Sequence, residues 1–382
     1  MVSGSGTDAR VAVIGGGVVG AAVAYTLARR GVSAILLEAE EHLGMAASGT
    51  NSGILHNGFD STPGKLETRL LLRSAELREA VLDQLAVPVL RCGALLQPQG
   101  GEDASAIAGL VRSAAANGVR VIGRGDGVLE VPGESVTDPV AYTLALAGAA
   151  AAAGVQLRTR ARVDGIEREG DRLALSLSGD RVGCEVAVNC AGLYADEVAR
   201  LAGDDSFEVY PRKGEFFVFD PPGGEALERI LLPVPTKRTK GVLVFPTVDG
   251  KVVAGPTAHD QHDKDDWSVR PEAADEVLPK ARAMLPALEG TEPIASYAGL
   301  RPAGRGVNYV IGPSAACPGL INVGAIRSTG LSASLGIAEY VVGLVAELGI
   351  ELGPDRELPA ASPAPNSEGP WWRRTAREKI GA

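Results

Sequence analysis

The sequence predicts a mixed α/β fold that combines a parallel sheet with a mainly antiparallel one. Residues 10–38 pass from an apolar run through a glycine-rich turn and a helical pattern to a second apolar run, the order of a parallel βαβ unit. Two further apolar runs, within 186–192 and 320–324, end in similar small-residue turns. Three short alternating strands within 215–257 are separated by turns, as in antiparallel sheets.

The first βαβ unit has distinct boundaries. Val11 to Ile14 form an apolar run typical of a buried parallel strand. An amphipathic pattern over 18–30 predicts a helix that ends at Gly31. A second buried strand, Ser33 to Leu37, is expected to pair beside the first.

The turn between the first strand and the helix carries a nucleotide-binding pattern. It reads Gly15-x-Gly17-x-x-Gly20, and Glu38 follows the second strand. Gly15 permits the tight turn, Gly17 lets the backbone approach a pyrophosphate, and Gly20 lets the helix pack on the strand. Glu38 is placed to accept hydrogen bonds from the hydroxyl groups of a ribose. We therefore predict a Rossmann-like dinucleotide site, with phosphate charge at the helix N-terminus.

This pattern does not by itself distinguish NAD from FAD, so the next segment matters. An NAD domain would continue with regular strands and helices. Residues 40–60 instead read EEHLGMAASGTNSGILHNGFD, a long polar and glycine-rich loop that contains His56.

Seven segments of the chain carry a family resemblance in their sequence and order. They are SGTNSGILHNG (48–58), VTDPVAYTLALAGAAAAAGV (136–155), VAVNCAGLYADEVARLAG (186–203), PRKGEFFVFD (211–220), GVLVFPTVDGKVVAGPTA (241–258), ASYAGLRPAG (295–304) and GLINVGAIRSTGLSASLGIAE (319–339). Together they resemble the D-amino-acid-oxidase-like superfamily of FAD-dependent oxidoreductases. Within it they are most similar to the branch of L-2-hydroxyglutarate dehydrogenase and FAD-dependent glycerol-3-phosphate dehydrogenase. The likeness extends to about residue 348.

The resemblance implies an FAD cofactor and two interleaved domains. A Rossmann-like FAD-binding domain would be assembled from 1–80, 138–204 and 296–348, and a substrate domain with a mainly antiparallel sheet from 81–137 and 205–295. Residues 349–382 would form a C-terminal tail.

The resemblance also implies which residues contact FAD. Besides Gly15, Gly17, Gly20 and Glu38, they are Ser48, Asn51, Ser52, Val163, Ala191, Gly192, Gly330, Leu331 and Ser332. A helix that begins near Gly330 would stabilise negative charge on the reduced flavin ring. Plain capping of this helix by Ser328 or Thr329 is an alternative, and both can hold together.

The predicted reaction needs a base, a hydride donor aimed at the flavin, and an anchor for the substrate's anionic end. His56 is the candidate base, because an imidazole has an ordinary pKa of about 6.5; packing against the flavin is the alternative. Arg301, in the turn YAGLRP, is the candidate anchor, because a guanidinium matches carboxylate and phosphate geometry. Tyr297 is expected to line the same pocket. Arg327 departs from the family pattern, and it either binds a second anionic group or points outward.

We therefore predict an FAD-dependent dehydrogenase or oxidase for a small anionic alcohol, either a 2-hydroxy acid such as L-2-hydroxyglutarate or a polyol phosphate similar to glycerol 3-phosphate. An amine or amino-acid oxidase is the alternative, and a flavoprotein without catalytic function is a remote one. The electron acceptor is left open between a quinone, a carrier protein and oxygen.

The composition excludes other classes of function. A net charge of −10 argues against nucleic acid as a partner. The four cysteines lie far apart without a CxxC pair, and His259 and His262 are interpreted as solvated, so no metal site is expected.

With neither a signal peptide nor a membrane span predicted, a cytoplasmic location is expected. The basic run PTKRTKG (235–241) is typical of a solvated loop. The WWRR stretch (371–374) is either docked on the substrate domain or in peripheral contact with a membrane.

Overall fold

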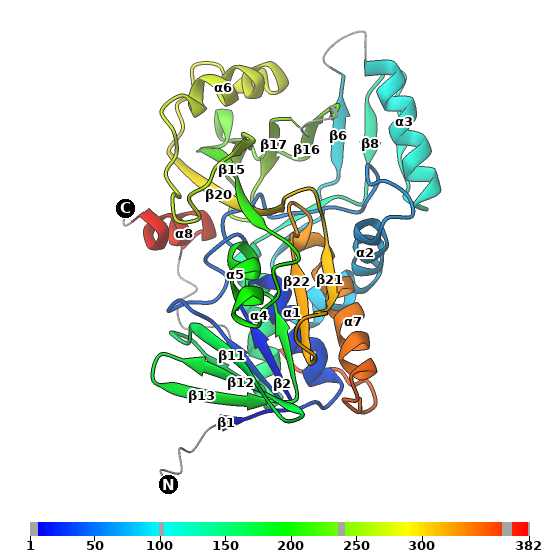
Figure 1. Cartoon of the computed structure of the whole chain (residues 1–382). Coiled ribbons are helices and arrows are strands. Elements are labelled where there is room, and N and C mark those ends of the chain that lie inside the picture. The colour runs from blue at the N-terminus through cyan, green and yellow to red at the C-terminus, as the bar shows by residue number, and fades with distance from the viewer. Residues whose placement is uncertain (1–6, 99–102, 236–240, 361–368, 381–382) are drawn as a thin grey trace.

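A six-stranded sheet forms the lower half of the molecule in the computed structural model (Figure 1), which describes residues 7–98, 103–235, 241–360 and 369–380. Its strand order is β10-β3-β2-β14-β22-β21, and β21 alone runs antiparallel to its neighbour. The strands are β2 (Val11–Ile14), β3 (Ala34–Leu37), β10 (Gln156–Arg158), β14 (Val186–Asn189), β21 (Val310–Pro313) and β22 (Leu320–Gly324). The central strands β2, β3, β14 and β22 are buried along their whole length, as expected when both faces of a parallel sheet are covered.

Helices cover one face of this sheet. Helix α1 (Val18–Arg29) lies between α4 (Pro139–Ala152) and α7 (Gly330–Glu347), and α2 (Leu66–Gln84) packs on α7. Helices α2 and α7 approach very closely, since a Cβ atom on Gly336 would collide with the carbonyl oxygen of Leu70. Helix α4 is capped by Asp138, whose side chain accepts hydrogen bonds from the backbone N–H groups of Val140 and Ala141.

A small second sheet covers the other face of the six-stranded sheet. Its order is β1-β13-β12-β11, and its apolar side chains share a core with those of β2 and β3. The elements are β1 (Thr7–Asp8), β11 (Val163–Glu169), β12 (Arg172–Leu177) and β13 (Asp180–Cys184), with α5 (Ala195–Leu201) beside them.

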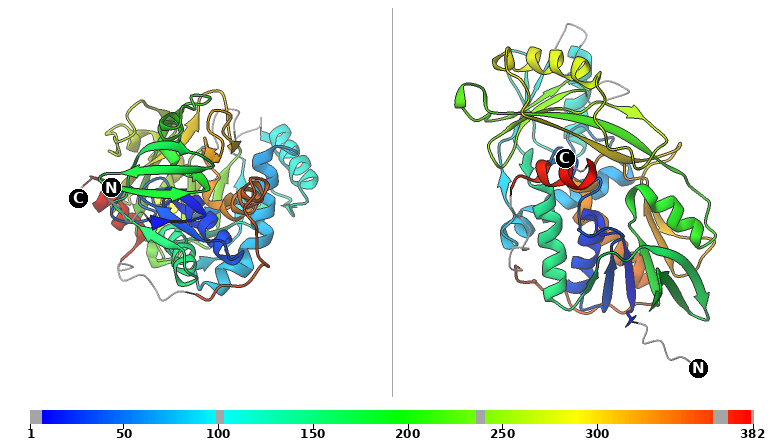
Figure 2. Two further views of the ribbon diagram at one scale, coloured as in Figure 1. Left: turned by 60° about the horizontal axis from the view of Figure 1, so that its bottom comes forward. Right: turned by 90° about the vertical axis from the view of Figure 1, so that its left-hand side faces the viewer.

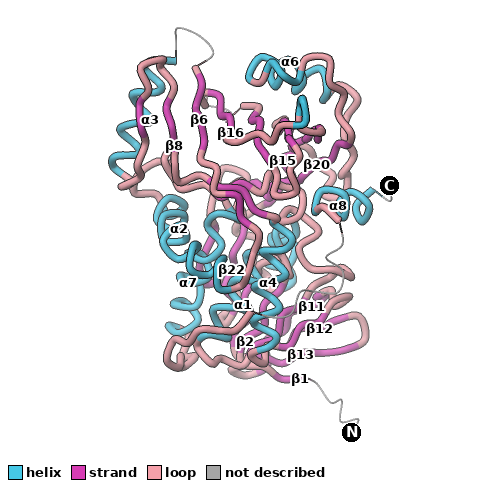
Figure 3. The backbone as a smooth tube through the Cα atoms, turned by 180° about the vertical axis from the view of Figure 1, so that it is seen from behind, coloured by secondary structure: helices cyan, strands magenta, loops and turns pink. Residues whose placement is uncertain are grey.

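A large, mainly antiparallel sheet forms the upper half of the molecule (Figures 1 and 3). Its order is β19-β15-β18-β17-β16-β6-β8-β7, with β20 paired to β15. The strands are β6 (Ala94–Gln97), β7 (Ile122–Gly123), β8 (Leu129–Val131), β15 (Val209–Phe219), β16 (Ile230–Pro233), β17 (Leu243–Pro246), β18 (Val252–Gly255), β19 (His259–Asp260) and β20 (Ala295–Gly304). Two segments far apart in sequence meet where β6 pairs with β16. Strand β20 pairs with β15 throughout, so residues 296–304 lie with this sheet and not with the parallel one.

The remaining elements flank these sheets. Helix α6 (Ala273–Met284) packs on the large sheet. The others are α3 (Asp103–Ala116), the three-stranded sheet of β4 (Ile54–Leu55), β9 (Ser135–Thr137) and β5 (Val89–Leu90), and three 3₁₀ turns, η1 (Gly192–Tyr194), η2 (Pro222–Gly224) and η3 (Pro286–Leu288).

The tail carries a helix, α8 (Trp371–Ile380), that docks on the protein (Figure 2). Trp371 and Trp372 are each only 1% exposed, and Trp371 packs edge-on against Tyr297 with ring centroids 5.3 Å apart. Arg374 forms an ion pair of 2.9 Å with Asp138 at the start of α4. A membrane contact through the two tryptophans would require this helix to leave its site.

Among the described residues, one helix is long and apolar enough to cross a membrane, and it is α7. Because 67% of this helix is buried inside the protein, its apolar character is that of a core helix.

Candidate active site

A cavity of about 790 Å³ opens at the carboxyl ends of β2, β14 and β22. This is the edge where open α/β sheets bind their ligands. Its lining includes the turn after β2, the loop 47–56, the start of α2, part of β20 with its arginine, and residues 323–331. The cavity therefore lies between the parallel sheet and the large sheet.

The three glycines of the turn after β2 have different surroundings. Gly15 has φ +108°, and a Cβ atom there would collide with the carbonyl oxygen of Cys190. A Cβ atom on Gly20 would collide with the carbonyl oxygen of Gly15. Gly17 has an ordinary φ of −71°, and its Cβ would meet nothing closer than the Ser48 hydroxyl at 3.1 Å. Gly15 and Gly20 thus serve the packing of the turn, whereas Gly17 borders the cavity.

Two helices point their N-termini into this cavity. No side chain of the N-cap residue caps either α1 or α7, and residues 17–19 and 328–331 line the cavity. The backbone N–H of Val18 donates to the Ser48 hydroxyl at 2.9 Å. The Thr329 side chain does not cap α7, and its hydroxyl donates to Glu67 at 2.8 Å. Helix N-termini favour negative charge.

His56 lies in the cavity wall at the end of β4, and hydrogen bonds hold it on several sides. Its backbone N–H donates to the Ser332 hydroxyl at 2.9 Å, and its carbonyl accepts from Arg78 at 3.0 Å. Its ring atom Nδ1 lies 2.7 Å from a carboxylate oxygen of Glu134. The Glu134 side chain is fully buried. Sequence reasoning missed Glu134 and Arg78, since nothing in their local sequence indicates that they contact this loop.

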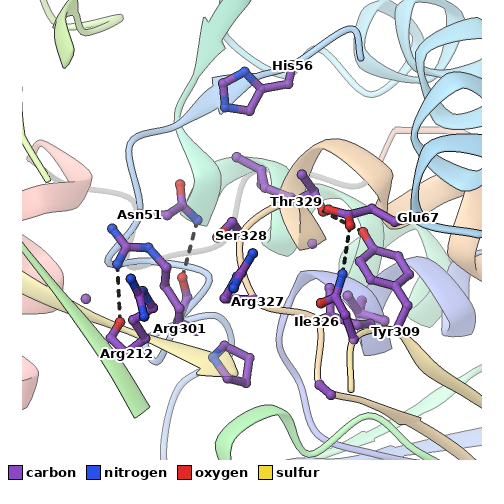
Figure 4. Close-up of a pocket in the computed structure, with 18 of the residues that line it drawn as sticks. Asn51, His56, Glu67, Arg212, Arg301, Tyr309, Ile326, Arg327, Ser328 and Thr329 are labelled. Atoms are coloured by element: carbon purple, nitrogen blue, oxygen red, sulfur yellow. Dashed lines mark hydrogen bonds between the residues drawn. The ribbon is translucent and has the colours of Figure 1, made fainter. Parts of the chain in front are cut away.

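Three arginines gather on one side of the cavity (Figure 4). Arg301, on β20, donates at 3.3–3.4 Å to the carbonyl oxygens of Arg212, Lys213 and Thr257. Within the described part of the chain, none of its contacts is a carboxylate. Burial and the charges of Arg212 and Arg327 lower the pKa of Arg301 to about 10. Arg212 forms a 2.8 Å ion pair with Asp260, and Arg327 is exposed at the cavity. This side of the cavity therefore carries a positive potential, which favours negative charge.

Hydroxyl and acidic groups lie on the opposite side (Figure 4). The Tyr309 and Thr329 hydroxyls are 2.7 Å apart, and Glu67 accepts from both Thr329 and Asn308. Burial raises the pKa of Tyr309 well above its ordinary value. Sequence reasoning did not find this group, because its members come from α2 and from two loops.

The other predicted residues divide between the cavity and its surroundings. Those that line it are Gly17, Ser48, Asn51, Ser52, His56, Gly192, Arg301, Arg327, Gly330 and Leu331. Gly15, Gly20, Glu38, Val163, Ala191, Ser332 and Tyr297 are not among its lining residues.

Four of these residues have defined contacts within the protein. Tyr297 is buried behind the loop, where its hydroxyl donates to the carbonyl oxygen of Asn51 and its ring stacks on Phe216, so it does not line the substrate pocket. Val163 is buried in the apolar core of the small sheet. Ser332 supports the backbone of the histidine loop. The Glu38 carboxylate accepts from the backbone N–H of Gly16 at 2.7 Å, while its contact with a ribose stays a prediction.

The basic stretch 236–240 lies outside the described residues. His259 of β19, which the sequence analysis interprets as solvated, pairs with Glu276 of α6 at 2.7 Å.

The fold and the cavity are those of a dinucleotide-binding protein, with arginines gathered on one side of the cavity. The model of the FAD dependent oxidoreductase family (DAO) matches residues 10–344, and the chain belongs to this family. It is 28% identical over 354 residues to glycerol 3-phosphate dehydrogenase of Caloramator mitchellensis, covering 88% of this chain and 74% of that protein. It is 27% identical to mitochondrial L-2-hydroxyglutarate dehydrogenase of Homo sapiens, covering 65% of this chain and 60% of that protein.

A solved structure is similar over nearly the whole chain. The dithionite-reduced L-α-glycerophosphate oxidase of Mycoplasma pneumoniae, with FAD bound, superimposes with a TM-score of 0.86 at 25% identity, covering 94% of this chain and 99% of that one. The predicted fold class, the family and the FAD cofactor are thereby confirmed.

The residues of the cavity fit FAD. An open backbone at Gly17, at the N-terminus of α1, suits a pyrophosphate. The uncapped start of α7 suits the electron-rich edge of a flavin ring. The cavity volume is also in the range of cofactor sites.

Proposed function

We propose that this FAD-dependent oxidoreductase oxidises the hydroxyl-bearing carbon of a small alcohol that carries a dianionic group. Glycerol 3-phosphate and related polyol phosphates are the first candidates, and 2-hydroxy dicarboxylic acids such as L-2-hydroxyglutarate are the second. The observation that carries the proposal is the presence, in one cavity, of a histidine and of three arginines whose charge is only partly balanced.

Different residues of the chain bind the substrate and accept its proton. Arg301 and Arg327 bind the anionic end, and Arg212 adds to the positive potential there. The His56 ring accepts the hydroxyl proton, since it lines the same cavity. Bound FAD supplies the acceptor for the substrate hydride. The walls formed by the loop 47–56 and by β20 hold base and anchor in fixed positions, which reduces the entropy lost on reaching the reactive geometry.

The names of the relatives support an alcohol substrate. Glycerol 3-phosphate and L-2-hydroxyglutarate, named in two of them, both carry a hydroxyl group and a strongly anionic end. An amine oxidase would need no strong base, because a neutral amine can give up its hydride directly. A histidine fixed at the cavity wall therefore favours an alcohol.

The test is anaerobic reduction of the bound flavin, followed by stopped-flow absorbance, which isolates this half-reaction from the electron acceptor. The panel contains glycerol 3-phosphate, L-2-hydroxyglutarate, lactate, glycerol and glycine. We expect the first or the second to bleach the flavin much faster than the others. In His56→Ala the rate with that substrate should fall by about 10²–10⁴-fold, the usual loss of general-base assistance. Faster bleaching by glycine, or an unchanged rate in His56→Ala, would refute the proposal.

A further inference from the structure

We propose that Glu134 is the positioning residue of His56. In this arrangement Nδ1 of the imidazole carries the hydrogen, which it donates to Glu134, and Nε2 remains as the nitrogen that accepts a proton. The catalytic consequence rests on the proposed function, but the tautomer itself does not.

The contacts of Glu134 define the direction of this hydrogen bond. Glu134 directly precedes β9 in the chain, and its side chain is fully buried, with one oxygen 2.7 Å from His56 Nδ1. The other oxygen accepts from the backbone N–H of Asn57 at 2.8 Å. Because a carboxylate has no hydrogen to donate, we assign the hydrogen of this contact to Nδ1. The nearby guanidinium of Arg78 supplies a positive charge beside this buried acid.

The other ring nitrogen is left without a protein partner. Within the described residues, His56 Nε2 forms no hydrogen bond, and the side chain is 12% exposed at the cavity wall. Ser332 and Arg78 hold the backbone of His56 on both sides. The remaining freedom of the residue is rotation of its ring and exchange of its tautomer, and the contact with Glu134 restricts both.

Replacing Glu134 with glutamine should reverse the tautomer. The two carboxylate oxygens of Glu134 face the backbone N–H of Asn57 and Nδ1 of His56. If the amide oxygen accepts from Asn57, the amide NH₂ points at Nδ1, which must then be the acceptor. The ring hydrogen moves to Nε2, and the free proton-accepting nitrogen is lost. The opposite amide orientation would place two buried donors against each other, which is costly.

The chain offers a matched control in a second histidine and acid pair. His259 Nε2 lies 2.7 Å from Glu276, but these side chains are 42% and 34% exposed, outside the cavity lining. Glu276→Gln makes the same chemical change at the same distance. It should leave His56 and its reaction untouched.

The experiment is nitrogen-15 NMR of the FAD-loaded protein labelled at histidine, at a pH where the rings are neutral. The four histidines give four sets of imidazole nitrogen signals. The set that is lost in His56→Gln belongs to His56. We expect the hydrogen on Nδ1 in the parent and in Glu276→Gln, and on Nε2 in Glu134→Gln. The flavin of Glu134→Gln should be reduced about 10²–10⁴-fold more slowly, with FAD content and substrate affinity retained.

Two results would overturn the role of Glu134. One is a hydrogen on Nε2 of the His56 ring in the parent protein, which requires no folded Glu134 variant. The other is an unchanged tautomer in a folded Glu134→Gln. If His56→Ala reduces its flavin at the rate of the parent protein, His56 is not the base. The tautomer of His56 measured by NMR would still test whether Glu134 positions the ring.

Discussion

Replacing Gly17 with valine should separate cofactor binding from folding. The backbone of Gly17 is in an ordinary extended conformation, and the direction of its absent side chain is open apart from the Ser48 hydroxyl at 3.1 Å. A valine there projects into the space of the cofactor's pyrophosphate. Overpacking of this kind costs roughly 1–3 kcal/mol, so FAD should bind at least about 5- to 150-fold more weakly. The thermal unfolding of the apoprotein should change little.

The matched variant is Gly20→Ala. Its new methyl group would collide with the carbonyl oxygen of Gly15 inside the turn, so a similar cost of roughly 1–3 kcal/mol should appear in folding. Titration of apoprotein with FAD, followed by flavin fluorescence, gives the affinity, and calorimetry without FAD gives the midpoint of unfolding. A Gly17→Val protein with parental FAD affinity, or one destabilised as much as Gly20→Ala, would contradict the assigned roles of the two glycines.

Arg301→Lys should raise KM for the anionic substrate with FAD content unchanged, because lysine keeps the charge but loses the two-pronged geometry; equal steady-state kinetics would remove Arg301 as the anchor. In the parent, KM should rise as pH passes about 10, since the guanidinium then loses the proton whose pKa burial and its neighbouring arginines lower. Trp371→Ala should destabilise the protein by about 3–5 kcal/mol, because the side chain is 1% exposed. Arg373→Ala on the same helix should cost no more than about 1 kcal/mol, because its exposed guanidinium makes only a cation–π contact with the Trp372 ring. Equal unfolding midpoints for these two variants would show that α8 adds little stability.

Local patterns predicted the parts of the fold that depend on neighbouring residues. The strand over 11–14, the helix from 18 and the helix start at Gly330 are confirmed. Each follows from a run of apolar residues beside a glycine, and such signals need no distant partner.

Contacts between distant segments could not be predicted in this way. Glu134 reaches His56 because β9 pairs with β4, and no periodicity in either segment encodes that pairing. Tyr297 was expected in the substrate pocket from its nearness to Arg301 in sequence, but its side chain is buried behind the loop instead. The pairing partners of a strand decide which side chains meet across segments.

The docking of α8 behind the loop has a consequence for the order of events during synthesis. Thr375 of this helix packs against Gly49, and Trp371 packs against Tyr297, which in turn holds Asn51. The loop leaves the ribosome early, but its backing helix is made late. In a growing chain, the loop 47–56 is therefore synthesised long before α8, the helix that packs behind it. Tight loading of FAD should accordingly be a late event, and ribosome-bound chains stalled before residue 371 should retain less flavin than released ones.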